Sequence, residues 1–318
     1  MILIMSDEND ASTTDVIMWL RHWHIPFKRI NLEENYHFSR MDISNNLVEM
    51  IIKNERQEIS LSKVTSFWYR RGKLTLSLPK SRFVSEISEQ IRNHLMEEFS
   101  DLENFFYTYL GKLAHIGTFH TRNVNKSEVL YEAKKVGLNI PITLITNNKA
   151  DLKGVFQSNY ITKGISKVFI PEIENEGYIT YTVGLDNKKI PSSFFPSLFQ
   201  DHIEKEADIR VFYLCGKFYS MAIRSQENIQ TKTDFRKYDR VNPNRCVPFK
   251  LPLEIEDKLG VLMQKVNLET GSIDLILDKK GSFFFLEINP VGQFGMTSIP
   301  CNYYLEKKIA NELYQISK

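Results

Sequence analysis

The sequence predicts a protein of mixed α/β and α+β class, built from three consecutive parts. The run from Met1 to Met5 is apolar and then turns polar at once, which is typical of a buried first strand. Apolar residues recur at helical spacing between about Val84 and Leu113, and strands alternate with helices up to that point, which favours a mostly parallel sheet. The last part contains a long apolar hairpin from Gly271 to Asn289.

Composition narrows the class of protein. The chain has 318 residues, of which 42% are hydrophobic and 25% charged, as is usual for a soluble globular protein. The net charge is +2 and no long basic run occurs, so we expect no nucleic-acid partner. The 3 cysteines are scattered without a metal or disulfide pattern, which fits a reduced, cytoplasmic setting. No stretch approaches the roughly 20 apolar residues of a membrane helix, so we expect no membrane partner.

Pattern changes along the chain predict three domains, at residues 1–122, 123–196 and 197–318. In the first domain, the polar residues Ser12 to Asp15 can cap a helix. The second domain begins with a helix from Lys126 to Val136, ended by Gly137, and carries a short strand that ends at Lys163. The third domain contains strands at 209–214 and 218–223, a helix at about 253–266, and the hairpin.

The hairpin carries the strongest chemical pattern. Turn residues at 278–281 allow a two-residue or a four-residue loop, and both loops would place Asp274 opposite Phe285. Phe285, Glu287 and Asn289 would then share one face with Asp274, with Glu287 on its diagonal. Two carboxylates and an amide oxygen on one face suit Mg²⁺. The alternative for Asp274 alone is a solvated hairpin face.

Other polar residues could serve a nucleotide. Lys126 opens a helix and Lys163 ends a strand, where either ammonium group could bind phosphates. Asp208 and Arg210 share a strand face, so one could accept from a ribose hydroxyl while the other holds a phosphate. A connecting segment could hold adenine through its backbone: Gln200, Asp201, His202 and Ile203. Taken singly, these features also fit solvated lysines, a surface ion pair and an ordinary linker.

The order of these motifs resembles the ATP-grasp superfamily over residues 123–292. Asn125-Lys126 and the following Gly137-Leu138-x-Ile140-Pro141 resemble the start of its central domain, and Asp208-Ile209-Arg210 matches its Asp-Ile-Arg strand. The resemblance implies an ATP-grasp fold with an N-terminal pre-ATP-grasp-like α/β domain, a small central domain and a C-terminal domain. ATP and two magnesium ions would bind between the last two.

The resemblance also implies a role for each matched residue. Lys126 and Lys163 would bind the ATP phosphates, the segment from Gln200 to Ile203 would hold adenine, and Asp208 would hold ribose. Arg210 and Arg224 would be catalytic and would steady an acyl phosphate. The magnesium ligands would be Asp274, Glu287 and Asn289.

A narrower resemblance, to graspetide synthetases of the grasp-with-spasm type, lies in three segments: Met1–Ser6, Phe67–Arg71 and Lys232–Asp239. It implies a homodimeric macrocyclase that joins Asp or Glu side chains of a precursor peptide, with a leader and an acidic core, to hydroxyls or amines. Omega-ester or omega-amide crosslinks would result. Four arginines could recognise the substrate carboxylates: Arg70, Arg71, Arg236 and Arg240. Two other functions fit the same residues: an ATP-grasp ligase that joins separate amino acids or peptides, and a non-catalytic nucleotide- or peptide-binding module.

Overall fold

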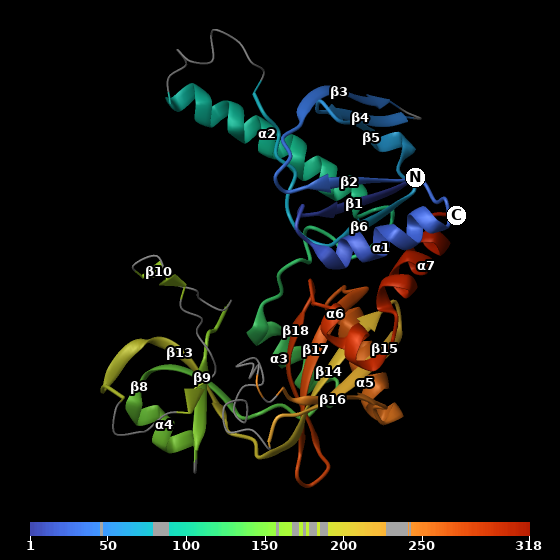
Figure 1. The fold of residues 1–318 in the computed structure, drawn as a ribbon. Helices are drawn as coiled ribbons and strands as arrows, with labels where there is room; N and C mark the ends of the chain where they lie inside the picture. The colour runs from blue at the N-terminus through green and yellow to red at the C-terminus, as the bar shows by residue number, and fades with distance from the viewer. Residues whose placement is uncertain are drawn as a thin grey trace. The chain divides into compact units, whose positions relative to one another are not determined.

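The computed structural model describes residues 1–44, 47–78, 89–156, 159–166, 190–226, 241 and 243–318, together with three short strands between residues 172 and 184. The chain forms two compact units (Figure 1). Unit 1 comprises residues 1–123, 293–298 and 304–318, and unit 2 comprises residues 124–292 and 299–303. The predicted boundary at residue 196 lies within a strand, Ser193–Asp201, so the division of unit 2 into two domains remains a prediction.

Unit 1 contains a four-stranded parallel sheet in the order β2-β1-β6-β7, which confirms the predicted parallel sheet. Its central strand β1 is buried along its whole length, as the apolar opening of the sequence predicts. A three-stranded antiparallel sheet, β3-β4-β5, was not predicted. The strands are β1 (Ile2–Ser6), β2 (Phe27–Asn31), β3 (His37–Ser44), β4 (Leu47–Lys53), β5 (Glu58–Ser60), β6 (Ser66–Tyr69) and β7 (Ala114–Ile116).

Helices complete unit 1. The first begins one residue after Asp10, whose carboxylate accepts from Thr13 N, so the predicted cap at 12–15 is wrong by about one turn. The predicted helical region before Leu113 forms one helix, α2. The C-terminal helix α7 packs against α1. The helices are α1 (Ala11–His22), the 3₁₀ turn η1 (Leu61–Lys63), α2 (Glu89–Leu110), α6 (Gly295–Cys301), which continues into unit 2, and α7 (Leu305–Ile316).

Unit 2 contains two main sheets. A four-stranded antiparallel sheet has the order β12-β9-β13-β8, and a five-stranded antiparallel sheet has the order β16-β15-β14-β17-β18. The strands of the first are β8 (Thr143–Asn148), β9 (Tyr160–Lys163), β12 (Val183–Gly184) and β13 (Ser193–Asp201); β10 (Glu172–Ile173) and β11 (Glu176–Gly177) form a separate pair. The strands of the second are β14 (Lys205–Leu214), β15 (Lys217–Arg224), β16 (Arg245–Phe249), β17 (Thr270–Asp278) and β18 (Phe283–Asn289).

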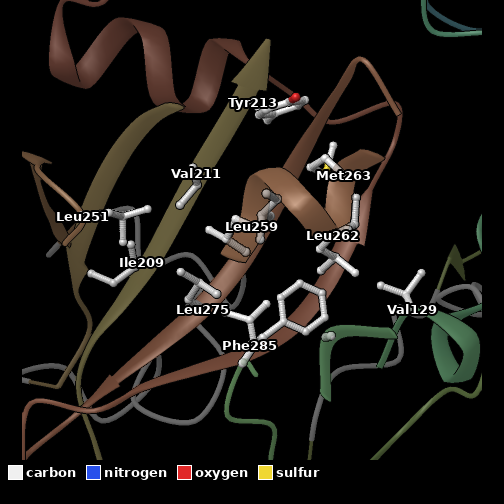
Figure 2. Close-up of a cluster of buried hydrophobic side chains, with 14 of the residues drawn as sticks. Val129, Ile209, Val211, Tyr213, Leu251, Leu259, Leu262, Met263, Leu275 and Phe285 are labelled. Atoms are coloured by element: carbon white, nitrogen blue, oxygen red, sulfur yellow. The ribbon is translucent and has the colours of Figure 1, made fainter. Parts of the chain in front are cut away.

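Two faces of the five-stranded sheet differ in chemistry. One face packs against α3 (Lys126–Lys135) and α5 (Leu253–Lys265), and α4 (Lys149–Val155) covers the other sheet. Figure 2 shows Leu259 and Leu262 of α5 over Ile209, Leu275 and Phe285 of the strands. Burial of such side chains stabilises the unit by roughly 1.5–3 kcal/mol each. The opposite face carries Arg210, Asp274 and Glu287 side by side on adjacent strands, and the candidate site lies there.

No helix among the described parts of the chain has both the length and the apolar character needed to cross a membrane.

Candidate active site

The β17–β18 hairpin has a different register from the predicted one. The loop holds three residues, 279–281, with Gly281 at φ 85°, and Asp278 N donates to Ser282 O at 2.9 Å. Further along, Leu275 pairs with Phe285 but Asp274 pairs with Glu287, so β18 has one extra residue, Leu286. The predicted pairing of Asp274 with Phe285 is therefore wrong by two residues.

The three-residue loop and this bulge each shift the register by one residue, and together they bring the two carboxylates closer in register than expected. Asp274 and Glu287 are direct cross-strand partners, and the next pair on the same face is Ser272 with Asn289. Direct partners have their Cβ atoms about 4.5–5.5 Å apart. Phe285, expected on the same face, is instead 1% exposed in the hydrophobic core. The prediction that Asp274, Glu287 and Asn289 share one face is thus confirmed.

Two cations flank the pair of carboxylates, one on each side. Arg210 on β14 is the direct neighbour of Asp274 on its other side, and Arg210 Nη1 lies 2.9 Å from Asp274 Oδ1 and 3.3 Å from Oδ2. Lys126 Nζ lies 3.1 Å from Glu287 Oε2. The row therefore runs from the Arg210 guanidinium through the Asp274 and Glu287 carboxylates to the Lys126 ammonium group.

Local folding explains why Lys126 reaches the sheet. Asn125 caps α3, with Oδ1 accepting from Ser127 N at 3.0 Å, so Lys126 is the first helical residue. Helix α3 packs on β18, and the chain after α3 pairs with the outer edge of β18 where Phe285 N donates to Asn139 O at 2.8 Å. A cation at a helix N-terminus opposes the helix dipole, whereas anions are favoured there. Glu287 offsets this cost in the structure, and a phosphate group would do the same.

The residues present fit a magnesium ion. Asp274 and Glu287 offer carboxylate oxygens, and the Asn289 amide donates to Glu287 Oε1 at 3.4 Å through Nδ2, so its oxygen is the atom it could offer to a metal. Among the described residues, no group of three or more His, Cys, Asp or Glu side chains could hold a metal. Mg²⁺ needs no such group, because it takes few protein ligands and completes its shell with waters and phosphate oxygens.

A second buried polar group lies beside this row. Lys205 Nζ donates to Asp208 Oδ1 at 2.7 Å and Oδ2 at 2.8 Å, and Ser225 Oγ donates to Asp208 Oδ2 at 2.7 Å. All three residues are buried. Sequence reasoning missed Lys205 and Ser225. Asp208 therefore already holds together the start of β14 and the residue that follows Arg224. Its predicted ribose contact remains a prediction.

The predicted adenine segment begins on β13 and continues past its end. Gln200 is fully buried, and its Nε2 donates to Thr143 Oγ1 at 2.9 Å. Asp201 is half-buried, and burial raises the pKa of its carboxyl; its backbone N donates to Ile142 O at 3.1 Å. His202 is exposed and Ile203 half-buried. Lys163 is the last residue of β9 and pairs with Leu198 of β13. Their nucleotide contacts remain predictions.

The four candidate substrate arginines divide into two pairs. Arg70 is 4% exposed in unit 1, and its Nε lies 3.1 Å from Asp10 Oδ2; Arg71 Nε also lies 3.1 Å from that atom. Burial raises the pKa of Asp10, but the two guanidinium groups and hydrogen bonds from Thr13 outweigh it, so the pKa is lowered overall. Arg236 and Arg240 lie outside the described residues. Arg224 is exposed at the end of β15, opposite Arg245.

Comparison with solved structures decides the fold. A RiPP-associated ATP-grasp ligase from Chryseobacterium gregarium, in complex with ADP and a leader and core peptide, is 23% identical with a TM-score of 0.80, over 99% of this chain and 95% of that chain. The chain has the ATP-grasp ligase fold. This confirms the fold expected from the motif order.

Two other structures support this fold assignment. The macrocyclase MdnC from Microcystis aeruginosa MRC, bound with its precursor peptide MdnA, is 23% identical with a TM-score of 0.75, over 99% of this chain and 100% of that chain. The ATP-grasp ligase PsnB, complexed with a precursor variant, Mg and ADP, is 15% identical with a TM-score of 0.71, over 100% of this chain and 98% of that chain. No protein-family model and no curated protein sequence matches the chain.

Proposed function

We propose that this protein is an ATP-dependent ligase that activates Asp or Glu side chains of a precursor peptide and joins them to hydroxyl or amine groups of the same peptide. The observation that carries the proposal is the direct cross-strand pair Asp274–Glu287, flanked by Arg210 and Lys126 within an ATP-grasp fold. The similar ligases named above were solved with precursor peptides and nucleotides, which favours the same substrates here.

The chain's own residues would divide the work. Asp274, Glu287 and Asn289 would hold magnesium, which when bound neutralises charge on the ATP phosphates. Lys126 and Lys163 would bind those phosphates, with Gln200 to Ile203 on adenine and Asp208 on ribose. Arg210 and Arg224 would stabilise the negative charge that develops on the activated carboxyl as an acyl phosphate. Arg70, Arg71, Arg236 and Arg240 are proposed to bind the acidic core of the peptide.

Bond formation within one peptide is favoured because the nucleophile and the activated carboxyl belong to the same chain. A hydroxyl or amine on the same peptide has a high effective concentration at the activated carboxyl, so ring closure can outcompete attack by a free amine. Each ester or amide bond removes the elements of one water from the peptide. These leave in the phosphate that is split from ATP, so the other products are ADP and phosphate. We further propose a homodimer, which is the assembly implied by the graspetide synthetase resemblance.

Mass spectrometry tests the proposal directly. The protein is incubated with ATP, Mg²⁺ and an acidic peptide encoded next to it that contains Ser, Thr or Lys. We expect the peptide mass to fall by one water per crosslink, with one ADP per bond. Glu287→Gln should abolish both signals and keep the circular-dichroism spectrum of the wild type. A mass gain that requires a second added substrate would instead indicate an intermolecular ligase, and the absence of ADP with every such peptide would count against catalysis.

A further inference from the structure

Both carboxylates among the proposed metal ligands are paired with cations that have a proposed role toward phosphate groups. Asp274 accepts from Arg210 at 2.9 Å, and Glu287 lies 3.1 Å from Lys126. The two pairs stand next to each other, because Asp274 and Glu287 are themselves direct partners. Each carboxylate thus already has a cationic partner before any ligand arrives.

We propose that these pairs exchange partners on ligand binding and thereby make the binding of magnesium and of nucleotide strongly interdependent. The inference rests on the proposed function, since it concerns the same site. With both ligands present, the carboxylates turn to the metal and the cations turn to the phosphates. Every charge then gains a new partner, and none is left alone.

Either ligand alone meets a penalty. A nucleotide without metal draws Lys126 away and leaves the Glu287 carboxylate beside Asp274 and the incoming phosphates, all of them negative. Magnesium without nucleotide draws the carboxylates away and leaves Arg210 and Lys126 facing a divalent cation. Like charges at such short range repel. The coupling is reciprocal, so each ligand must raise the affinity for the other by the same factor.

The two pairs contribute unequally. The Arg210 and Asp274 side chains are 9% and 12% exposed, and their contact involves both carboxylate oxygens. The Lys126 and Glu287 side chains are 21% and 15% exposed. The second pair is more accessible to solvent, so it opens more readily. Glu287 therefore acts as the main competitor of a metal-free nucleotide for Lys126.

Calorimetric titration with AMPPNP, in EDTA and in Mg²⁺, tests the inference. Wild-type protein should bind AMPPNP with Mg²⁺ and at least about tenfold more weakly in EDTA. Glu287→Gln should raise the affinity for AMPPNP in EDTA by about three- to tenfold, because Lys126 is released from its partner. The same substitution should lower the effect of Mg²⁺.

A double-mutant cycle assigns the gain to the ion pair. In a Lys126→Met background, Glu287→Gln should raise the EDTA affinity by less than half as much, in logarithmic units, as in the wild type. Glu254→Gln is the matched control, since it removes an equal charge from an exposed pair with Lys258 on α5 and should change nothing.

Two results would overturn the inference while leaving the proposed function intact. In the first, the wild type binds Mg²⁺-AMPPNP, but Glu287→Gln does not raise the affinity for AMPPNP in EDTA. The other is a gain that persists in full without Lys126, which would reflect simple repulsion of phosphate by Glu287. A wild-type protein that binds no AMPPNP even with Mg²⁺ would overturn both this inference and the proposed function.

Discussion

Arg210 and Asp274 occupy directly paired positions on β14 and β17, and both residues are buried. Their contact joins the centre of the five-stranded sheet to the proposed metal site. A buried ion pair adds little net stability compared with apolar residues of similar size, but loss of one partner leaves an uncompensated buried charge. The pair is therefore sensitive to single substitutions.

We predict that Arg210→Met lowers the free energy of unfolding by about 3 kcal/mol, because Asp274 is left buried without its cation. Urea unfolding measures this change. Replacing both partners, as Arg210→Met with Asp274→Leu, should recover most of the loss. Arg224→Met is the matched control: Arg224 is exposed at a strand end, so the change in stability should stay within about 0.5 kcal/mol. Equal free energies of unfolding for Arg210→Met and Arg224→Met would contradict the prediction.

The lowered pKa of the Asp10 carboxyl makes the stability of unit 1 depend on pH. Its pKa in the folded state is lower than the ordinary 3.8, because Arg70 and Arg71 favour the charged form more than burial opposes it. The unfolded state therefore binds the proton first as the pH falls. The stabilising contribution is complete above about pH 4 and is lost as the pH drops through the folded pKa.

Asp10→Asn isolates this effect, since asparagine can still cap α1 through its side-chain oxygen. We expect the variant to be less stable at pH 6 by about 2–3 kcal/mol, because Arg70 loses its carboxylate. The difference from the wild type should shrink below pH 4. Thermal unfolding followed by circular dichroism from pH 7 to pH 2.5 measures it. A difference that stays constant over this range would show that Asp10 does not titrate as argued.

Hydrophobic pattern and turn chemistry predicted much of the fold. The buried strand β1, the helix from Lys126, the turn at Gly137 and the face shared by Asp274 and Glu287 all follow from periodicity and glycine placement. These features depend on residues close in sequence. The motif order then identified the fold, although no single motif could.

The register of the hairpin could not be predicted, because it depends on a bulge. The three-residue loop, in place of the expected two or four residues, moved Phe285 to the other face. The extra residue Leu286 then moved Glu287 opposite Asp274, and it is apolar and looks like any other strand residue. The partners of buried charges were also missed. Lys205 stands between two glutamates, where no local pattern marks it as buried. Arg70 meets Asp10 from 60 positions away, which no local pattern reveals.

The chain packs tightly around Gly292, just after the end of the hairpin. A Cβ atom at this position would lie 2.6 Å from the backbone N of Ser272, as well as against its side chain, and Ser272 is fully buried. Ser272 is also the partner of Asn289, one pair from Asp274 and Glu287. Substitution here should therefore disturb both stability and the site.

We expect Gly292→Ala to lower the free energy of unfolding by about 2 kcal/mol through overpacking and to weaken Mg²⁺-AMPPNP binding. Ser272→Gly in the same chain should relieve only the side-chain part of the clash, giving partial rescue. Gly154→Ala on α4 is the control, since a Cβ there meets nothing within 4 Å and should stabilise the helix by about 0.5–1 kcal/mol. Similar effects of the two alanines on stability would refute the packing argument.

We predict that the Cys301 thiol is alkylated slowly in the folded protein. It is 6% exposed beside Met221 and Ile223, and burial, with a smaller effect from Cys246, raises its pKa from 9.0 to about 11. The thiolate is the reactive form, so about 100-fold less of it exists at pH 8 than in the unfolded chain. Alkylation by iodoacetamide, followed by peptide mass mapping, should therefore be at least about 100-fold slower in native protein than in urea. The native rate should keep rising up to about pH 11, whereas the rate in urea should level off near pH 9. Equal rates at pH 8 in the two conditions would show that Cys301 is neither buried nor shifted.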